Sequence, residues 1–182
     1  MVWFEFSLLP VYRFVAPAAR ASLVVRECGR LGLSAGVFRL QVVERSAIVK
    51  YTPNQMFALV NDVGRYPEFL PWCVGSRVAE ASDSHQVASV KIAVGVMRTE
   101  FTTRNALRPD QAITMELVDG PFRSLTGHWS FAAIGERGSR VQFRVEFEFK
   151  NRLTAAALSS TFETLCGTIV DAFVQRAKAV YG

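Results

Sequence analysis

The sequence has few of the residues that build metal centres and nucleophilic active sites. Its 182 residues include two histidines and three cysteines, and no HExxH, paired-cysteine or glycine-rich phosphate-binding motif occurs. Cys28, Cys73 and Cys166 are odd in number and far apart, which argues against a disulfide framework and gives no metal-ligand spacing. We therefore expect no metal and no resident cofactor. Each thiol is expected to be a small buried apolar group or a neutral surface group, and the protein to reside in a reducing compartment.

Catalytic patterns are equally scarce. His85 and His128 have no nucleophile or carboxylate at a spacing that indicates acid–base or covalent chemistry. Asp119 precedes a glycine, and Asp-Gly is typical of a turn. We therefore expect a protein that is not an enzyme. The alternative is an enzyme that uses a carboxylate or a histidine inside a cavity.

No charge of one sign dominates the body of the chain. The formal net charge is +5, but residues 1–41 hold five arginines and two acids, which leaves 16 basic and 14 acidic residues for 42–182. Such a nearly equal number of basic and acidic residues is poor evidence for DNA binding. Ribosome binding would need an exposed basic face. Acidic residues are interspersed among the basic ones here, so the alternative is that these basic residues form an ordinary solvated face. The candidates for such a face are Arg65, Arg77, Lys91, Arg98, Arg123, Arg144 and Lys150.

The first 41 residues contain no apolar run near the roughly 18 residues of a membrane span. They also lack the basic region that precedes the apolar part of a secretory signal. Their arginine-rich, acid-poor composition leaves an organellar transit peptide as one alternative. Because the regular pattern begins at Val42, we expect an N-terminal extension over 1–41, disordered or translated from an upstream start, and one domain over 42–182.

The domain starts with a strand and two short helices. Residues 42–51 alternate loosely and predict the strand. Thr52 begins a capping box with Pro53 and Gln55, and the helix that follows is expected to end at Gly64. Next, in NDVGRYPEFLPWC (61–73), two prolines predict a second short helix that begins at Pro67 and stops at Pro71. The aromatic residues of this stretch predict the underside of a lid hinged near Gly64, with Tyr66, Phe69 and Trp72 directed at the last helix or a cavity mouth.

Strands and one long helix make up the rest of the domain. Six strand-like runs are separated by turn signals and cover 75–82, 85–97, 98–107, 112–119, 125–134 and 140–149. Gly95 and Gly127 fall inside runs and predict bulges or bends. From 153 to 180, apolar residues recur every three or four positions, which predicts a long helix with one apolar stripe. The order indicates an α+β helix-grip fold, in which a curved antiparallel sheet of about seven strands wraps around the long C-terminal helix.

Several motifs, in this order, resemble the coenzyme Q-binding branch of the START-like (SRPBCC) superfamily, which includes the ribosome-association toxin RatA. They are NDVxxYPxFLPxC at 61–73, FTTRN at 101–105, LVDGPF at 117–122, GHWSF at 127–131, FEF at 147–149 and AFVQRAKAVYG at 172–182. The resemblance covers 42–182 and implies a cavity between the sheet and the last helix, roofed by the short helices, that accepts an apolar molecule. Fold resemblance alone does not settle function, because such scaffolds carry binders and enzymes alike.

The resemblance implies two functions. The first is a non-enzymatic protein that binds a polyprenyl quinone, ubiquinone by expectation, and supports respiration, with transient membrane contact. The alternative is a RatA-like translation inhibitor that binds the large ribosomal subunit and blocks subunit association. We expect a cytoplasmic protein, peripheral at the inner membrane when it exchanges ligand; the mitochondrial matrix is the alternative.

The predicted ligand contacts are apolar side chains with few polar anchors, as in other apolar sites. They are Phe57, Tyr66, Phe69, Leu70 and Trp72 from the roof, Phe143 and Phe147 from the sheet, and Phe162, Leu165, Ile169 and Phe173 from the final helix. We expect about half of them to border a pocket and the rest to be core. Arg176 is predicted to anchor a quinone carbonyl or other head group, or else to be an ordinary salt-bridged arginine. Arg104 and Asn105 are weaker candidates of the same kind.

Overall fold

A seven-stranded antiparallel sheet forms the centre of the part of the chain that this computed structural model describes, residues 40–182. The predicted extension over 1–41 therefore lies, apart from its last two residues, outside the described residues. The strands lie in the order β1-β7-β6-β5-β4-β3-β2. Their bounds are β1 (Gln41–Val49), β2 (Cys73–Ala81), β3 (His85–Val94), β4 (Met97–Arg108), β5 (Ala112–Asp119), β6 (Phe122–Ile134) and β7 (Gly138–Phe149).

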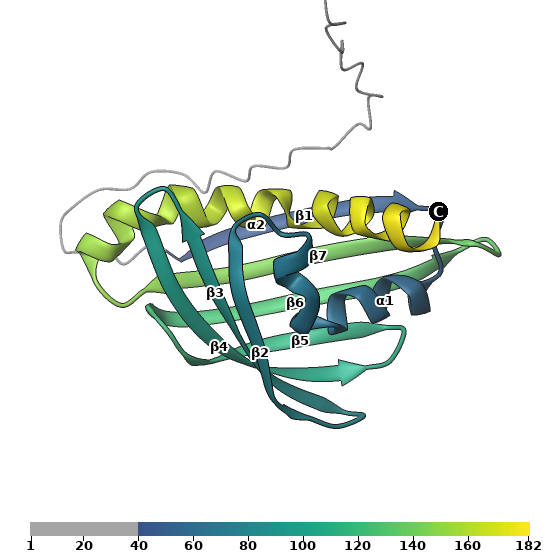
Figure 1. Cartoon of the computed structure of the whole chain (residues 1–182), viewed down its shortest axis with the longest axis horizontal. Coiled ribbons are helices and arrows are strands. Elements are labelled where there is room, and N and C mark those ends of the chain that lie inside the picture. Colours follow the sequence, from purple (N-terminus) through teal and green to yellow (C-terminus); the bar gives the residue numbers. More distant parts are fainter. Residues whose placement is uncertain (1–39) are drawn as a thin grey trace, which may run out of the picture. The chain divides into compact units, whose positions relative to one another are not determined.

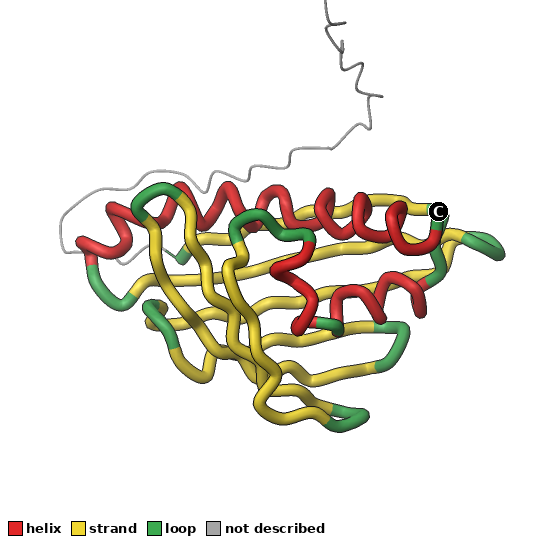
Figure 2. The backbone as a smooth tube through the Cα atoms, viewed as in Figure 1, coloured by secondary structure: helices red, strands yellow, loops and turns green. Residues whose placement is uncertain are grey.

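Three helical segments lie against the sheet (Figures 1 and 2): α1 (Pro53–Asn61), the 3₁₀ helix η1 (Val63–Glu68) and α2 (Arg152–Tyr181). The long helix α2 packs on β1, β7 and α1. It begins where the Asn151 side chain accepts a hydrogen bond from the Thr154 backbone N–H at 2.7 Å, an N-cap. The helix-grip fold predicted from the sequence is confirmed.

The first helix begins as predicted but ends early. Thr52 and Gln55 form the reciprocal capping box. The helix ends at Asn61, and the second helix is a 3₁₀ helix over Val63–Glu68 rather than a helix that starts at Pro67. Proline has no N–H, so Pro67 cannot donate to the Gly64 carbonyl within η1; this carbonyl instead accepts a 3.3 Å hydrogen bond from the Ser76 hydroxyl. Gly64 therefore lies inside η1 and ends neither helix.

The two strand glycines also differ from prediction. Gly95 has a φ of +55° and lies in the two-residue turn that joins the paired residues Val94 and Met97. The predicted run over 85–97 therefore ends at Val94. Gly127 is paired in regular register with Met115 and Val145, and the sheet's irregularities lie elsewhere. A Cβ at Gly127 would meet the Met115 side chain at close range, so this glycine makes room for a neighbour and forms no bulge.

The core lies between the concave face of the sheet and α2. The predicted alternation of β7 is confirmed, since Val141, Phe143, Val145, Phe147 and Phe149 are all buried. On α2 the buried residues include Phe162, Leu165, Phe173 and Ala177, whereas Val180 is exposed. By length and composition α2 could cross a membrane, and it is the one helix among residues 40–182 for which this holds. Its packing against the sheet accounts for the apolar stripe.

Candidate functional site

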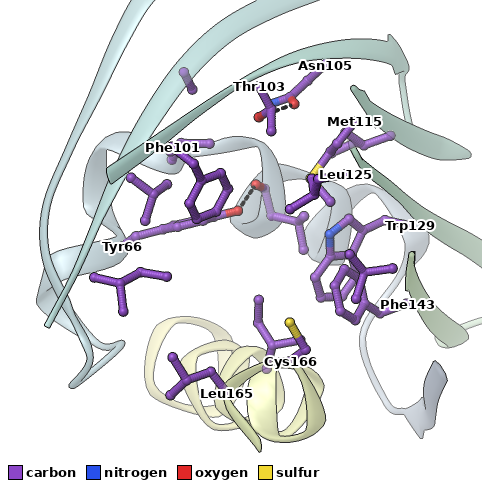
Figure 3. A pocket seen from close by; sticks show the side chains of 18 of the residues that line it. Tyr66, Phe101, Thr103, Asn105, Met115, Leu125, Trp129, Phe143, Leu165 and Cys166 are labelled. Carbon is purple, nitrogen blue, oxygen red and sulfur yellow. Dashed lines mark hydrogen bonds between the residues drawn. The ribbon is translucent and has the colours of Figure 1, made fainter. Parts of the chain in front are cut away.

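A cavity of about 80 Å³ lies between the sheet, α2 and the roof, by which we mean residues 53–72. Figure 3 shows strand residues such as Thr103 and Asn105 on one side and Leu165 and Cys166 of α2 on the opposite side. The roof contributes Val60, Asn61, Val63, Tyr66 and Trp72. The strands contribute Gln86, Ala88, Val90, Ile92, Phe101, Thr103, Asn105, Ile113, Met115, Leu125, Trp129, Phe143 and Val145, and the helix contributes Phe162, Leu165, Cys166 and Ile169.

The predicted contact residues divide into two equal groups. Those that line the cavity are Tyr66, Trp72, Phe143, Phe162, Leu165 and Ile169. Those that lie outside its lining are Phe57, Phe69, Leu70, Phe147, Phe173 and Arg176. Four of the second group, Phe57, Leu70, Phe147 and Phe173, are buried core, and Phe69 is partly buried against it. Phe57 packs edge-on against Phe131, and Phe147 packs against Phe122 and Phe162. Which of the lining residues touch a ligand stays a prediction.

An aromatic cluster attaches the roof to α2. The Phe173 ring has its centroid 5.4 Å from that of Tyr66, 5.2 Å from Phe69 and 5.3 Å from Trp129, each in an edge-to-face arrangement. Trp72 faces the cavity. The predicted orientation of the three roof aromatics, toward the long helix or the cavity, is confirmed. Tyr66 also donates its hydroxyl to the Val60 carbonyl at 2.6 Å.

Arg176 is salt-bridged and does not line the cavity. Its guanidinium lies 2.6 Å from the Glu68 carboxylate and 5.1 Å from the centroid of the Phe69 ring. The structure thus agrees with the alternative given for Arg176 in the sequence analysis, an ordinary salt-bridged arginine. Of the two weaker candidates, Arg104 is exposed on the outer face of β4, whereas Asn105 lines the cavity. Alternation along a strand sends these neighbours to opposite faces.

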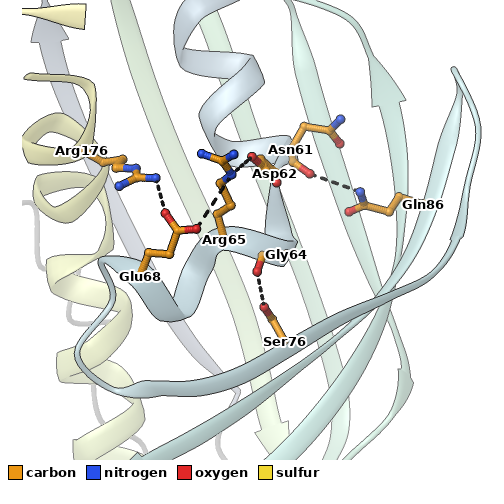
Figure 4. A network of polar contacts seen from close by, with 8 residues as sticks. All are labelled: Asn61, Asp62, Gly64, Arg65, Glu68, Ser76, Gln86 and Arg176. Carbon is orange, nitrogen blue, oxygen red and sulfur yellow. Dashed lines mark hydrogen bonds and ion pairs between the residues drawn. The ribbon is translucent and has the colours of Figure 1, made fainter. Parts of the chain in front are cut away.

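A chain of hydrogen bonds links polar side chains on the strand side of the cavity. Thr103 donates its hydroxyl to Asn105 Oδ1 at 2.8 Å, and Asn105 Nδ2 donates to Gln86 Oε1 at 3.4 Å. Gln86 Nε2 then donates to the Asn61 backbone carbonyl at 3.2 Å (Figure 4). Thr103, Asn105 and Gln86 are all at least nine-tenths buried. The polar end of the cavity is therefore held in a fixed geometry by its own side chains.

The ionisable groups of the lining are held neutral. Burial raises the pKa of the Cys166 thiol to about 12, so it is not a thiolate nucleophile at neutral pH. Burial also raises the pKa of the Tyr66 phenol. His85 and His128 are exposed and lie outside the lining. Within residues 40–182, no group of three or more metal-ligating side chains comes together. The arrangement can enclose a molecule, and it offers no charged acid or base to it.

Sequence reasoning missed most strand residues of the lining. Trp129 appears in the sequence only as the neighbour of His128, yet it is 1% exposed and faces the cavity. Strand alternation from Leu125 through Gly127 to Trp129 would have placed it on the inner face. Gln86 and Thr103 gave no such signal, because a polar residue on a strand is ordinarily expected on the wet face.

The comparison with known proteins agrees with this architecture. Residues 49–174 match the family described as polyketide cyclase/dehydrase and lipid transport. The chain belongs to this family. The ribosome association toxin RatA of Vibrio cholerae serotype O1 is 48% identical to this chain over 143 residues, which cover 79% of this chain and 99% of that protein. The mitochondrial coenzyme Q-binding protein coq10 of Schizosaccharomyces pombe is 28% identical over 145 residues, covering 77% of this chain and 88% of that protein.

Solved structures of other proteins share the fold. The 18 kDa protein CC1736 from Caulobacter crescentus is 32% identical, covers 79% of this chain and 99% of its own, and has a TM-score of 0.61. The Zhui aromatase/cyclase from Streptomyces sp. R1128 has a TM-score of 0.68 at 15% identity, covering 77% of this chain and 94% of its own. At that identity the likeness concerns the fold alone. The resemblance to the START-like superfamily and its RatA branch is confirmed.

Proposed function

We propose that this protein acts as a RatA-like translation inhibitor, which binds the large ribosomal subunit and blocks subunit association. The observation that carries the proposal is the 48% identity to the ribosome association toxin RatA of Vibrio cholerae, over 99% of that protein. The relative named for coenzyme Q binding is 28% identical. The alternative drawn from the sequence therefore has better support than quinone binding as the main function, and it sets the expected location in the cytoplasm.

Arginines on the outer face of the sheet are the candidate contacts for ribosomal RNA. Arg104 and Arg108 point outward from the same face of β4, and neither forms an ion pair within residues 40–182. Arg140 on β7 is likewise exposed and free of an ion pair in the described part of the chain. Contacts from such residues to phosphates release counterions, so the association should weaken steeply with salt.

Ribosome profiles test this proposal directly. The full-length protein is overproduced, and the lysate is separated on sucrose gradients; the expected result is a loss of 70S ribosomes and a gain of free subunits. Arg104→Glu and Arg108→Glu, made separately, should each reduce the effect, whereas Lys178→Glu, on the exposed side of α2, makes the same change of charge and serves as the control. Subunit and 70S peaks that stay unchanged at high protein levels would rule out the proposal.

The cavity supports a second candidate function, the binding of an apolar ligand without catalysis. Its lining within residues 40–182 is largely apolar and contains no charged side chain. We propose a polyprenyl quinone such as ubiquinone as one ligand, because a relative is named a coenzyme Q-binding protein. At about 80 Å³ the cavity is small beside ordinary ligand sites, so we expect it to widen, by an outward movement of the roof, when a ligand enters.

Organic extraction tests the second candidate. The purified protein from a quinone-producing host is extracted with solvent, and the extract is analysed for quinone by mass spectrometry. Stoichiometric quinone is the expected result. An unrelated apolar protein purified in parallel controls for carry-over, and extracts that repeatedly match this control would count against quinone binding.

A further inference from the structure

The polar side chains of the cavity have more hydrogen-bond donors than they use. Asn105 and Gln86 each donate one hydrogen of their side-chain NH₂ group to a neighbour, and the second hydrogen of each has no partner within residues 40–182. Asn61 Oδ1 is buried without a hydrogen-bond partner. Because buried polar atoms are normally paired, these groups are ready to bind a polar atom supplied by something inside the cavity.

The indole of Trp129 adds a donor from a different strand. Trp129 is 1% exposed and lines the cavity, and its N–H has no hydrogen-bond partner among the described residues. Figure 3 shows the nitrogen on the side of the ring that faces Met115 and Leu125, which are also lining residues. An indole nitrogen only donates, so this group specifically requires an acceptor.

No cation balances this donor-rich end. The described lining contains no Lys, Arg or His, and Arg176 is occupied by Glu68 outside it. A buried carboxylate or phosphate without a positive partner carries a large desolvation cost, whereas a neutral carbonyl, ether or hydroxyl oxygen does not. Neutral amide and indole donors can satisfy the lone pairs of such an oxygen.

We propose that Gln86, Asn105 and Trp129 donate to the acceptor oxygen of a neutral amphiphile, and that this subsite discriminates against acidic lipids. Thr103 orients the Asn105 amide, and Asn61 Oδ1 can accept from a ligand hydroxyl. The apolar part of the ligand lies against the aromatic and aliphatic lining. This inference rests on the second candidate function, apolar ligand binding. It adds the chemistry of the head group and the residues that select it.

Matched ligands of one chain length test the selection. Isothermal titration of the full-length protein at pH 8 compares 2-decanone, 1-decanol and decanoate. The ketone and the alcohol should bind at least about tenfold more tightly than the ionised acid. Equal affinity for all three would overturn the subsite while leaving apolar ligand binding in place. If none of the three binds, both the subsite and apolar ligand binding fail.

Two variants assign the selection to the polar residues. Asn105→Leu and Thr103→Val keep approximate side-chain volume and should lower the ratio of the affinity for 2-decanone to that for n-decane, which has no acceptor oxygen, by about threefold to tenfold, the value of one or two hydrogen bonds. Thr126→Val, on the outer face of β6, is the matched control and should leave the ratio unchanged. Because both ligands are measured on the same sample, the ratio does not depend on how much of a variant is folded. An unchanged ratio in both variants would overturn the assignment.

Discussion

Arg176 of α2 and Glu68 of η1 form an ion pair that joins the roof of the cavity to the long helix, with 2.6 Å between Nη2 and Oε2 (Figure 4). The guanidinium also lies over the ring of Phe69, which itself packs on Phe173. Arg65 approaches Glu68 and Asp62 at 3.9 and 3.5 Å from within the roof. The pair is therefore part of a small network that holds the roof closed.

Replacement of Arg176 by Met should loosen this closure. The Arg176 side chain is 18% exposed, whereas that of Arg144, which pairs with Glu146 and Glu44, is 46% exposed. We expect Arg176→Met to lower the free energy of unfolding by about 1–2 kcal/mol, through the lost pair and cation–π contact. The control Arg144→Met should cost less than about 1 kcal/mol. Urea unfolding of both variants measures the two losses of stability. Glu68→Gln and the double variant with Arg176→Met complete a double-mutant cycle, and a zero coupling energy between Arg176 and Glu68 would contradict a stabilising ion pair.

Phe173 is the residue whose loss should disturb the roof most. Its side chain is fully buried and contacts Tyr66, Phe69 and Trp129. We expect Phe173→Ala to destabilise the protein by about 3–5 kcal/mol, since it removes a large apolar group and leaves a cavity. Val180→Ala, on an exposed position of the same helix, should stay within about 0.5 kcal/mol of the wild type. Comparable denaturation midpoints for the two variants would show that the cluster is not the attachment point.

Gly127 leaves room for the side chain of Met115, which lines the cavity. A methyl group at this position would lie 2.1 Å from the present place of Met115 Cε, so the flexible end of that side chain must move. We expect Gly127→Ala to destabilise by about 1–3 kcal/mol and to reduce affinity for an apolar ligand as the methionine shifts. The double variant Gly127→Ala with Met115→Ala should restore binding. Ligand titration is the readout, and failure of the second substitution to restore affinity would argue against the packing explanation.

The Cys166 thiol should make the protein less stable in alkali. Its pKa is raised from the ordinary 9.0 to about 12 by burial, so between these values the unfolded chain releases a proton that the folded chain keeps. The stabilising contribution is complete below pH 9 and is lost as the pH rises toward 12, by about 1.4 kcal/mol per pH unit. Unfolding curves of wild type and Cys166→Ala from pH 8 to 11 should converge as the pH rises. Parallel curves would mean that the thiol does not contribute.

Prediction from the sequence was most reliable where the local residue pattern and the burial of the side chains indicate the same secondary structure. The capping box at Thr52 and the alternating residues of β7 needed no tertiary information, because each is satisfied within a few residues of chain or by one buried face. It failed at Pro67, which lies inside the 3₁₀ helix η1 rather than at the start of a helix, and where the Gly64 carbonyl finds its partner in Ser76, a residue on the next strand. It failed again at Gly127, whose role is set by Met115 on a neighbouring strand.

By itself, then, the amino-acid order determined the helix-grip fold, the family and the inward direction of Tyr66, Phe69 and Trp72, since periodicity and motifs are properties of the chain. Only the tertiary structure decided which apolar residues are core and which border the cavity. It alone paired Arg176 with Glu68 and brought Gln86, Thr103 and Asn105 together. The reason is physical: a side chain's partners across a sheet or between helix and roof depend on register and curvature, which no single segment of sequence specifies.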